Sequence, residues 1–270
     1  MNRLIQEKLQ ELASYASLSK EQNKPEIKYK CETCKDHGII LKGEQAVVCS
    51  CMKQKSINNK FKHANIGAQI QNANFTNFNL SFYPDTNNDE NGNPNYRQIA
   101  QITLNAAKQF AEDIANNKKS KGLLITGPVG SGKTFLAAAI ANYLITKDKQ
   151  VLFVVVPDLL DEIRSTYQKQ SEEVTELLLT ESAREAEILI LDDLGVHNYT
   201  EWTINKLYSI INYRANNELP LVVTTNLDML QLEKCLGERM TSRLLQLCQL
   251  HRLIVDLDIR HQLYLKQAKI

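Results

Sequence analysis

Eight consecutive residues in the middle of the chain have the types and spacing needed to hold a phosphate group. They satisfy the pattern GxxxxGK(S/T). They are Gly127, Pro128, Val129, Gly130, Ser131, Gly132, Lys133 and Thr134. Glycines let backbone N–H groups converge on phosphate oxygens, and the start of a helix adds positive potential. The lysine would reach the β and γ phosphates and the threonine hydroxyl would bind Mg²⁺, so the motif predicts an ATP and magnesium site rather than a chance glycine turn.

Polar side chains also follow two later apolar runs. ILILDD ends in Asp192 and Asp193, and LVVTTN ends in Asn226. Ligands of parallel sheets bind at the carboxyl ends of the strands. We therefore expect Asp192 to hold Mg²⁺ through water, Asp193 to orient or deprotonate the attacking water, and Asn226 to hold that water against the γ-phosphate. The alternatives are a helix cap for the two aspartates and a simple turn for Asn226.

Two arginines further along the chain are four residues apart. Arg239 and Arg243 in GERMTSRLL share one face of a helix. Two guanidinium groups on one face can reach the γ-phosphate held by a neighbouring subunit, as an arginine finger does. They could equally be surface charges that pair with Glu233 or Glu238.

Four cysteines predict a metal site near the N-terminus. Cys31 and Cys34 are separated by two residues, and after fourteen more residues Cys49 and Cys51 follow. Two close thiol pairs around a hairpin-sized segment are typical of a small tetrahedral Zn²⁺ site, and the metal would supply folding energy that so short a module lacks. His37 could replace one thiol. A redox CxxC is the weaker interpretation, and Cys235 and Cys248 have the apolar neighbours of core residues.

The elements that must position these residues alternate between strand-like and helical patterns. Such alternation predicts an α/β fold in which a parallel sheet carries helices on both faces. The strand-like runs are 122–126, 151–156, 188–192 and 221–225, and the helical runs start at Lys133, extend to about 185 after the second strand, and cover 201–216. We divide the chain into an N-terminal region with the zinc module (1–60), a linker (61–97) and an ATPase domain (98–270).

Composition sets the class of protein. The chain has 270 residues, a net charge of +1 and 43% hydrophobic residues, and none of its apolar runs is long enough to cross a membrane. Without a secretory signal pattern, a cytoplasmic, reducing location is expected. Residues 2–22 have the apolar period of an amphipathic helix, which would pack on the cysteine module or dock on another protein.

The ordered set of motifs resembles the DnaC/DnaI family of replicative helicase loaders, whose AAA+ domain is related to DnaA and IstB. The resemblance runs over nearly the whole chain. It rests on CETCKDHG with CSC, NANFTNF, GPVGSGKT, ILILDDLGVHNYTEW, LYSIINYR, VVTTNL, LGERMTSRL and DLDIR. It implies a P-loop AAA+ domain without a C-terminal lid, an N-terminal region that binds a hexameric DnaB-type replicative helicase, and placement of that helicase on single-stranded DNA with ATP as the switch.

The resemblance also implies roles for particular residues. Arg243 becomes the arginine finger, with Arg239 in support, which implies self-association or another nucleotide-binding neighbour. The segment that contains Ser165 and Tyr167 would contact single-stranded DNA, unless it is only an amphipathic helix that covers the sheet. Many AAA+ proteins carry Glu where this chain has Asp193. The shorter side chain and the missing lid imply a weak ATPase that a partner or DNA stimulates.

Trp202 is expected to pack, and Arg214 either approaches a neighbour's nucleotide or forms a structural ion pair. Two other functions remain open. The chain could be an IstB-like transposition ATPase, or a zinc-folded adaptor whose nucleotide site is only structural.

Overall fold

The computed structural model describes most of the second half of the chain and parts of the first. The described residues are 31, 33–42, 45–49, 51–52, 72–85, 94–166, 176–195 and 199–267. The chain forms two compact units, Met1–Cys49 and Ser50–Ile270. The helix predicted over 2–22 lies outside the described residues, and the boundaries predicted at 60 and 97 stay a prediction. No helix in the described ranges is both long and apolar enough to cross a membrane.

The second unit is built on a parallel sheet of five strands in the order β4-β5-β6-β3-β7. Every neighbouring pair is parallel. The strands are β3 Gly122–Thr126, β4 Val151–Val155, β5 Ile188–Leu194, β6 Leu221–Thr225 and β7 Cys248–Arg252. The four strands that the apolar runs predict are confirmed. β7, beside β3, was not predicted, because its pattern CQLHR is polar and three of its five residues are largely exposed.

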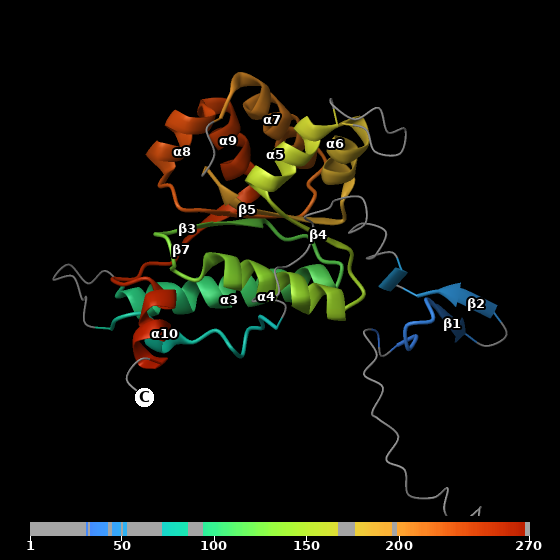
Figure 1. The fold of residues 1–270 in the computed structure, drawn as a ribbon, viewed down its shortest axis with the longest axis horizontal. Helices are drawn as coiled ribbons and strands as arrows, with labels where there is room; N and C mark the ends of the chain where they lie inside the picture. Colours follow the sequence, from blue (N-terminus) through green and yellow to red (C-terminus); the bar gives the residue numbers. More distant parts are fainter. Residues whose placement is uncertain are drawn as a thin grey trace, which may run out of the picture. The chain divides into compact units, whose positions relative to one another are not determined.

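Helices cover both faces of this sheet, as Figure 1 shows: α3, α4 and α10 lie on one side, and α5 to α9 on the other. The helices are α3 Tyr96–Ala115, α4 Lys133–Thr146, α5 Val156–Ser165, α6 Glu176–Glu185, α7 Glu201–Asn216, α8 Met229–Leu236, α9 Glu238–Leu247 and α10 Ile259–Gln267. The predicted α/β architecture with helices on both faces is therefore confirmed.

The core divides at the sheet, because alternate side chains of each strand point to opposite faces. Ile188 and Ile190 on β5 pack under α3 and α4, whereas Leu189 and Leu191 pack under α5 to α9. All strand residues of β3 are buried. Strands β3 to β6 are thus buried on both faces, which explains why their sequences are continuous apolar runs.

A short segment before α3 joins the core of the second unit. Ala73, Phe78 and Tyr83 are buried in the cluster under α4, and the segment ends with the 3-10 helix η2, Leu80–Phe82. These residues fall inside the stretch 61–97 that the sequence suggested as a linker. The aromatic residues of NANFTNF and FY therefore cover the face that carries α4, because their apolar area stabilises the fold when buried.

The first unit contains a two-stranded antiparallel hairpin, β1 Ile39–Lys42 and β2 Gln45–Val48. Few of its described side chains are buried: Cys34 and Cys49 are, whereas Ile39 and Val48 are more than half exposed. A two-stranded hairpin with so little burial is marginal by itself in water.

Candidate functional site

The predicted phosphate-binding loop connects β3 to α4, between the sheet and the N-terminus of a helix. Gly130 has a φ of 72° and Gly132, which caps α4, has a φ of 89°, a left-handed conformation that residues with a Cβ atom rarely adopt. A Cβ atom at Gly130 would lie 2.0 Å from the Cγ of Asp258. The glycines are thus needed both for the curvature of the loop and for the close approach of another segment.

Lys133 is buried at the first position of α4. Its Nζ donates to the carbonyl oxygens of Gly127 and Pro128, each at 2.9 Å, which uses two of its three donors. Burial lowers the pKa of Lys133, while Asp193 and Asp192 act in the opposite direction. The ammonium group is therefore held inside the curve of the loop, where the P-loop pattern requires it.

Asp192 lies beside Thr134 at the carboxyl end of β5. Its Oδ1 accepts hydrogen bonds from Thr134 Oγ1 at 3.1 Å and from Thr224 Oγ1 at 2.5 Å. The side chain is 2% exposed, and burial raises the pKa of Asp192 to about 6. The structure brings together the two residues predicted to bind magnesium, one hydroxyl and one carboxylate, which are oxygen donors of the kind Mg²⁺ prefers.

An irregularity in β5 directs the second aspartate. The pairing of β5 with β6 shifts register between Leu191 and Leu194, and Asp193 has a φ of 56°. Its backbone N–H donates to Thr224 Oγ1 at 3.0 Å. A β-bulge of this kind changes the direction in which a side chain leaves the strand. Thr224, which the sequence analysis did not single out, therefore fixes both aspartates through one hydroxyl group.

Two polar atoms around the loop are buried without a hydrogen-bond partner among the described residues. They are Ser131 Oγ in the loop and Asn226 Oδ1 after β6. Buried polar atoms of this kind are costly unless a ligand, ion or water completes them. Together with Lys133, Thr134 and Asp192, they make the chemistry of the site suitable for a nucleotide triphosphate with Mg²⁺.

A segment from the end of the chain also contacts the loop. Ile259 N–H donates to the carbonyl oxygen of Gly130 at 3.0 Å, and Arg260 forms an ion pair with Asp258 at 2.8 Å. The pKa of Asp258 is lowered mainly by its hydrogen bond to Arg260. The motif DLDIR contains these residues, but only the tertiary structure shows that they lie against the loop.

Tyr83, which precedes the loop in the sequence, also supports it. Its hydroxyl donates to the carbonyl oxygen of Ser131 at 2.8 Å, and its ring stacks on Phe78. Burial raises the pKa of Tyr83, so the hydroxyl stays protonated as a donor. Tyr83 could not be predicted as a site residue, because no local pattern around Phe82 and Tyr83 indicates contact with a loop 48 residues away.

The two arginines of α9 are accessible. Arg239 is exposed, and Arg243 donates to Gln246 Oε1 at 2.7 Å. Within the described ranges neither arginine forms an ion pair, with Glu233, Glu238 or any other carboxylate. Their guanidinium groups are therefore available to a neighbouring molecule, and the finger role stays a prediction.

Arg214 has a structural role, through hydrogen bonds to carbonyl oxygens in place of the suggested ion pair. It is fully buried, and its guanidinium donates to four carbonyl oxygens, those of Ala183, Arg184, Ala186 and Pro220. Burial lowers the pKa of Arg214 to about 9. The residue thus joins the C-terminal end of α6 to the start of β6, and it forms no ion pair among the described residues.

The residues predicted to contact DNA are only partly described. Ser165 Oγ donates to the carbonyl oxygen of Glu162 at 2.9 Å, and Tyr167 lies outside the described residues. Trp202 packs on the core face above β5, with Arg164 and Lys206 over its ring at 5.7 and 5.9 Å. The packing role expected for Trp202 agrees with this position.

The four cysteine thiols converge as the spacing predicts. The sulfur atoms of Cys31, Cys34, Cys49 and Cys51 all lie within 4.8 Å of one another, and those of Cys31 and Cys49 are 3.8 Å apart. A tetrahedral zinc ion with Zn–S bonds of about 2.3 Å places its sulfurs about 3.8 Å apart. Gly38 N–H donates to Cys34 Sγ at 3.3 Å, and His37 is exposed outside the group. The donor set therefore fits Zn²⁺ with four thiolates.

Comparison with known proteins identifies the family of the larger unit. A family model described as IstB-like ATP binding protein matches residues 92–269, which is more than half of the chain. The chain belongs to this family of IstB-like ATP-binding proteins. The matched residues include the loop, both aspartates, Asn226 and the two arginines of α9.

Curated relatives of the chain confirm the resemblance to DnaC and DnaI. The replicative helicase loader DnaC of Escherichia coli (strain K12) is 29% identical over 153 residues, which are 56% of this chain and 61% of that protein. The replicative helicase loader DnaI of Bacillus subtilis (strain 168) is 32% identical over 119 residues, 43% of this chain and 37% of that protein. The matched region thus spans less than two thirds of the length of either relative.

Solved structures confirm the AAA+ fold of this IstB-like chain. A crystal structure of DnaI has a TM-score of 0.52 and 29% identity, and covers 68% of this chain and 89% of that one. A crystal structure of the DnaC helicase loader has a TM-score of 0.55 and 24% identity, covers 70% of this chain and all of that one, and supports the fold alone.

Proposed function

We propose that this chain is an ATP-controlled loader that places a hexameric, DnaB-type replicative helicase on single-stranded DNA. The observation that carries the proposal is that the similar E. coli and B. subtilis proteins are both named replicative helicase loaders. The geometry around Lys133, Thr134 and Asp192 supports the ATP-dependent part. In this function the cysteine module, with bound zinc, belongs to the N-terminal region that contacts the helicase in the cytoplasm.

The residues of the site divide the work of ATP binding and hydrolysis. Residues 127–134 hold the phosphates through backbone N–H groups and Lys133. Thr134 and Asp192 would hold Mg²⁺, which would supply positive charge beside the phosphates. Asp193 and Asn226 orient the attacking water. Since Asp193 is buried only in part and is shorter than a glutamate, slow hydrolysis follows unless a neighbour completes the site.

Arg243, with Arg239 in support, completes the site of a neighbouring nucleotide-binding subunit. Both guanidinium groups are free of ion pairs among the described residues, so little has to be broken before they approach a phosphate. An arginine supplied by a neighbouring subunit makes ATP hydrolysis depend on assembly of the subunits. Hydrolysis would then occur only when the helicase and the single strand are bound. Ser165 and Tyr167 are proposed to contact that strand.

Co-purification with a hexameric replicative helicase tests the proposal. Full-length protein with zinc and ATP is expected to hold the helicase, and ATPase activity is expected to rise when single-stranded DNA is added. Lys133→Ala should retain helicase binding through the cysteine module but lose loading. Absence of any helicase complex with ATP and zinc present would remove the loader function.

The second candidate is an IstB-like transposition ATPase, which the description of the family model favours. Stimulation of the ATPase by a transposase but not by a helicase would support it. Lys133→Ala distinguishes an adaptor with a structural nucleotide site from both ATPases. The variant would keep full function if ATP hydrolysis had no role.

A further inference from the structure

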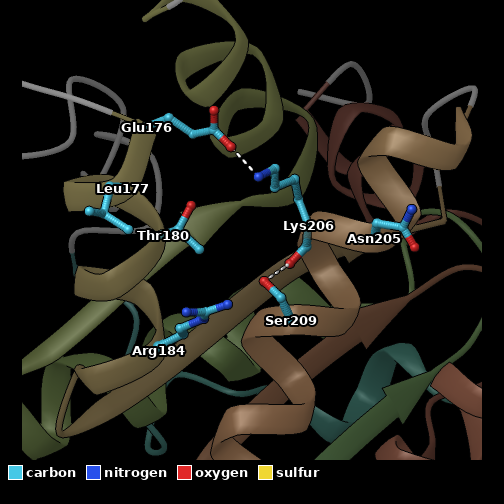
Figure 2. Close-up of a pocket in the computed structure, with 7 residues that line it drawn as sticks. All are labelled: Glu176, Leu177, Thr180, Arg184, Asn205, Lys206 and Ser209. Atoms are coloured by element: carbon cyan, nitrogen blue, oxygen red, sulfur yellow. Dashed lines mark hydrogen bonds and ion pairs between the residues drawn. The ribbon is translucent and has the colours of Figure 1, made fainter.

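A polar pocket of about 540 Å³ lies between α6 and α7. Figure 2 shows that Thr180 and Arg184 of α6 point toward α7, which contributes Lys206 and Ser209. None of the residues of the phosphate loop, and neither Asp192 nor Asp193, lines it. The pocket is therefore separate from the ATP site, and no function described above uses it.

Two hydrogen-bond donors in this pocket have no partner among the described residues. Thr180 is 5% exposed, and its Oγ1 is buried without a hydrogen bond. Arg184 Nε is also buried without one. A threonine hydroxyl on a helix usually bonds to a carbonyl one turn earlier, and an unmet buried donor costs free energy. A ligand with acceptor oxygens would satisfy both donors.

The charge of the pocket indicates an anion. Arg184 and Lys206 contribute two positive charges, and Glu176 contributes one negative charge through an ion pair with Lys206. An anion that enters would replace Glu176 as the partner of Lys206.

The number and directions of the donors favour a phosphate group over a carboxylate. Thr180 and Arg184 approach from α6 and Lys206 from α7, and a tetrahedral phosphate has oxygens for donors from several directions, whereas a carboxylate has two in one plane. A volume of about 540 Å³ also exceeds that of a phosphate alone. Asn205 can bond the edge of a base, and Leu177, 62% exposed, can pack on its face.

We propose that the pocket between α6 and α7 is a second phosphate-ester site, which takes one nucleotide unit, either free or within a single strand. The phosphate accepts hydrogen bonds from Thr180 Oγ1, Arg184 Nε and Lys206 Nζ. This proposal does not depend on the loader function, because it follows from the pocket alone.

Binding of two probes to the full-length protein tests the site. The probes are thymidine monophosphate, followed by calorimetry, and a short fluorescein-labelled oligothymidylate, followed by anisotropy. Saturation with a non-hydrolysable ATP analogue and Mg²⁺ blocks the P-loop in both experiments. Saturable binding of the monophosphate assigns the free nucleotide as a source, and binding of the oligothymidylate alone assigns the strand. Binding of neither probe overturns the proposal.

Three substitutions locate the binding. Thr180→Val and Arg184→Met should each weaken binding on the order of tenfold, because each removes a hydrogen bond to a charged acceptor. Glu176→Gln should strengthen binding several-fold, because it removes the carboxylate that competes for Lys206. Lys118→Met is the control: it removes an exposed positive charge outside the pocket, and affinity should stay within twofold of the wild type.

The signs of these effects separate a binding role from a structural one. Thr180→Val keeps the shape of the side chain and removes an unmet buried hydroxyl, so the thermal midpoint should hold or rise while affinity falls. A misfolded Glu176→Gln protein could not bind more tightly. Equal affinity of the wild type, Thr180→Val and Arg184→Met would overturn the proposal even if a probe binds elsewhere.

Discussion

The cysteine module and the P-loop unit of this chain reach a defined structure by different means. The P-loop unit buries two apolar clusters on the faces of a five-stranded sheet, so its site rests on a dry scaffold. The cysteine module has a hairpin with exposed Ile39 and Val48, and among its described residues the buried apolar side chains are Cys34 and Cys49. The folding free energy that burial supplies grows with the apolar area removed from water. The folding free energy that metal binding supplies does not depend on that area. We therefore expect the P-loop unit to stay folded without ATP, and the cysteine module to unfold without zinc.

Removal of zinc should have the largest effect, because it should unfold the cysteine module and leave the P-loop unit folded. A chelator, or Cys34→Ser, should unfold the module, because structural zinc contributes on the order of 10 kcal/mol of folding free energy. Limited proteolysis and NMR would show the loss around residues 31–51, while the thermal midpoint of the P-loop unit stays the same. Cys235→Ser, which changes a thiol outside the cluster, is the control. A module that keeps its protection without metal would refute the zinc assignment.

Arg214→Met should show how far the larger unit depends on one buried polar group. The change keeps most of the side-chain volume but leaves four buried carbonyl oxygens without their donor. We expect a loss of about 3 kcal/mol in the free energy of unfolding, measured in urea. Lys119→Met, which removes an exposed ion pair with Glu218, should leave the urea midpoint unchanged. Equal midpoints for the two variants would mean that the four hydrogen bonds contribute little.

Lys133→Ala should separate function from stability in the P-loop unit. ATP hydrolysis is expected to fall on the order of a hundredfold, because the variant lacks the cation that stabilises charge on the phosphates. Zinc content and helicase binding should be retained. Lys147→Ala, at the other end of α4, is the control for loss of a lysine on the same helix. An unchanged rate for Lys133→Ala would exclude the loop as the hydrolytic site.

The last expected effect is on the free energy of unfolding, which the buried carboxylate of Asp192 lowers. Burial raises the pKa of Asp192 from 3.8 to about 6, so between these values the folded protein binds more protons than the unfolded chain. Stability therefore falls as the pH rises through this window, and the whole cost is present above it. In metal-free protein at pH 7, Asp192→Asn should raise the free energy of unfolding by at most about 3 kcal/mol. Urea titrations across the pH range would show the slope disappear in the variant.

The sequence predicted the parts of the candidate site that depend on local patterns. The GxxxxGKT loop, the strand that ends in Asp192 and the four cysteines carry their chemistry within a few residues. Parallel strands align their carboxyl ends, so the contact of Thr134 with Asp192 followed from the predicted fold. Thr224 was missed, because a threonine inside a buried strand has no pattern that distinguishes a site residue from a packed one.

The phosphate loop, the succession of central strands and helices along the chain, and the grouping of four thiols were all predictable from the sequence alone. The contacts of Asp258 and Tyr83 with the loop became visible only in the folded chain. The same holds for the hydrogen bonds of Arg214 to the C-terminal end of α6, and for the pocket that Thr180 and Arg184 line with α7. The physical reason is separation along the chain. Local patterns fix backbone conformation and face, whereas contacts between distant segments depend on how the packed elements meet.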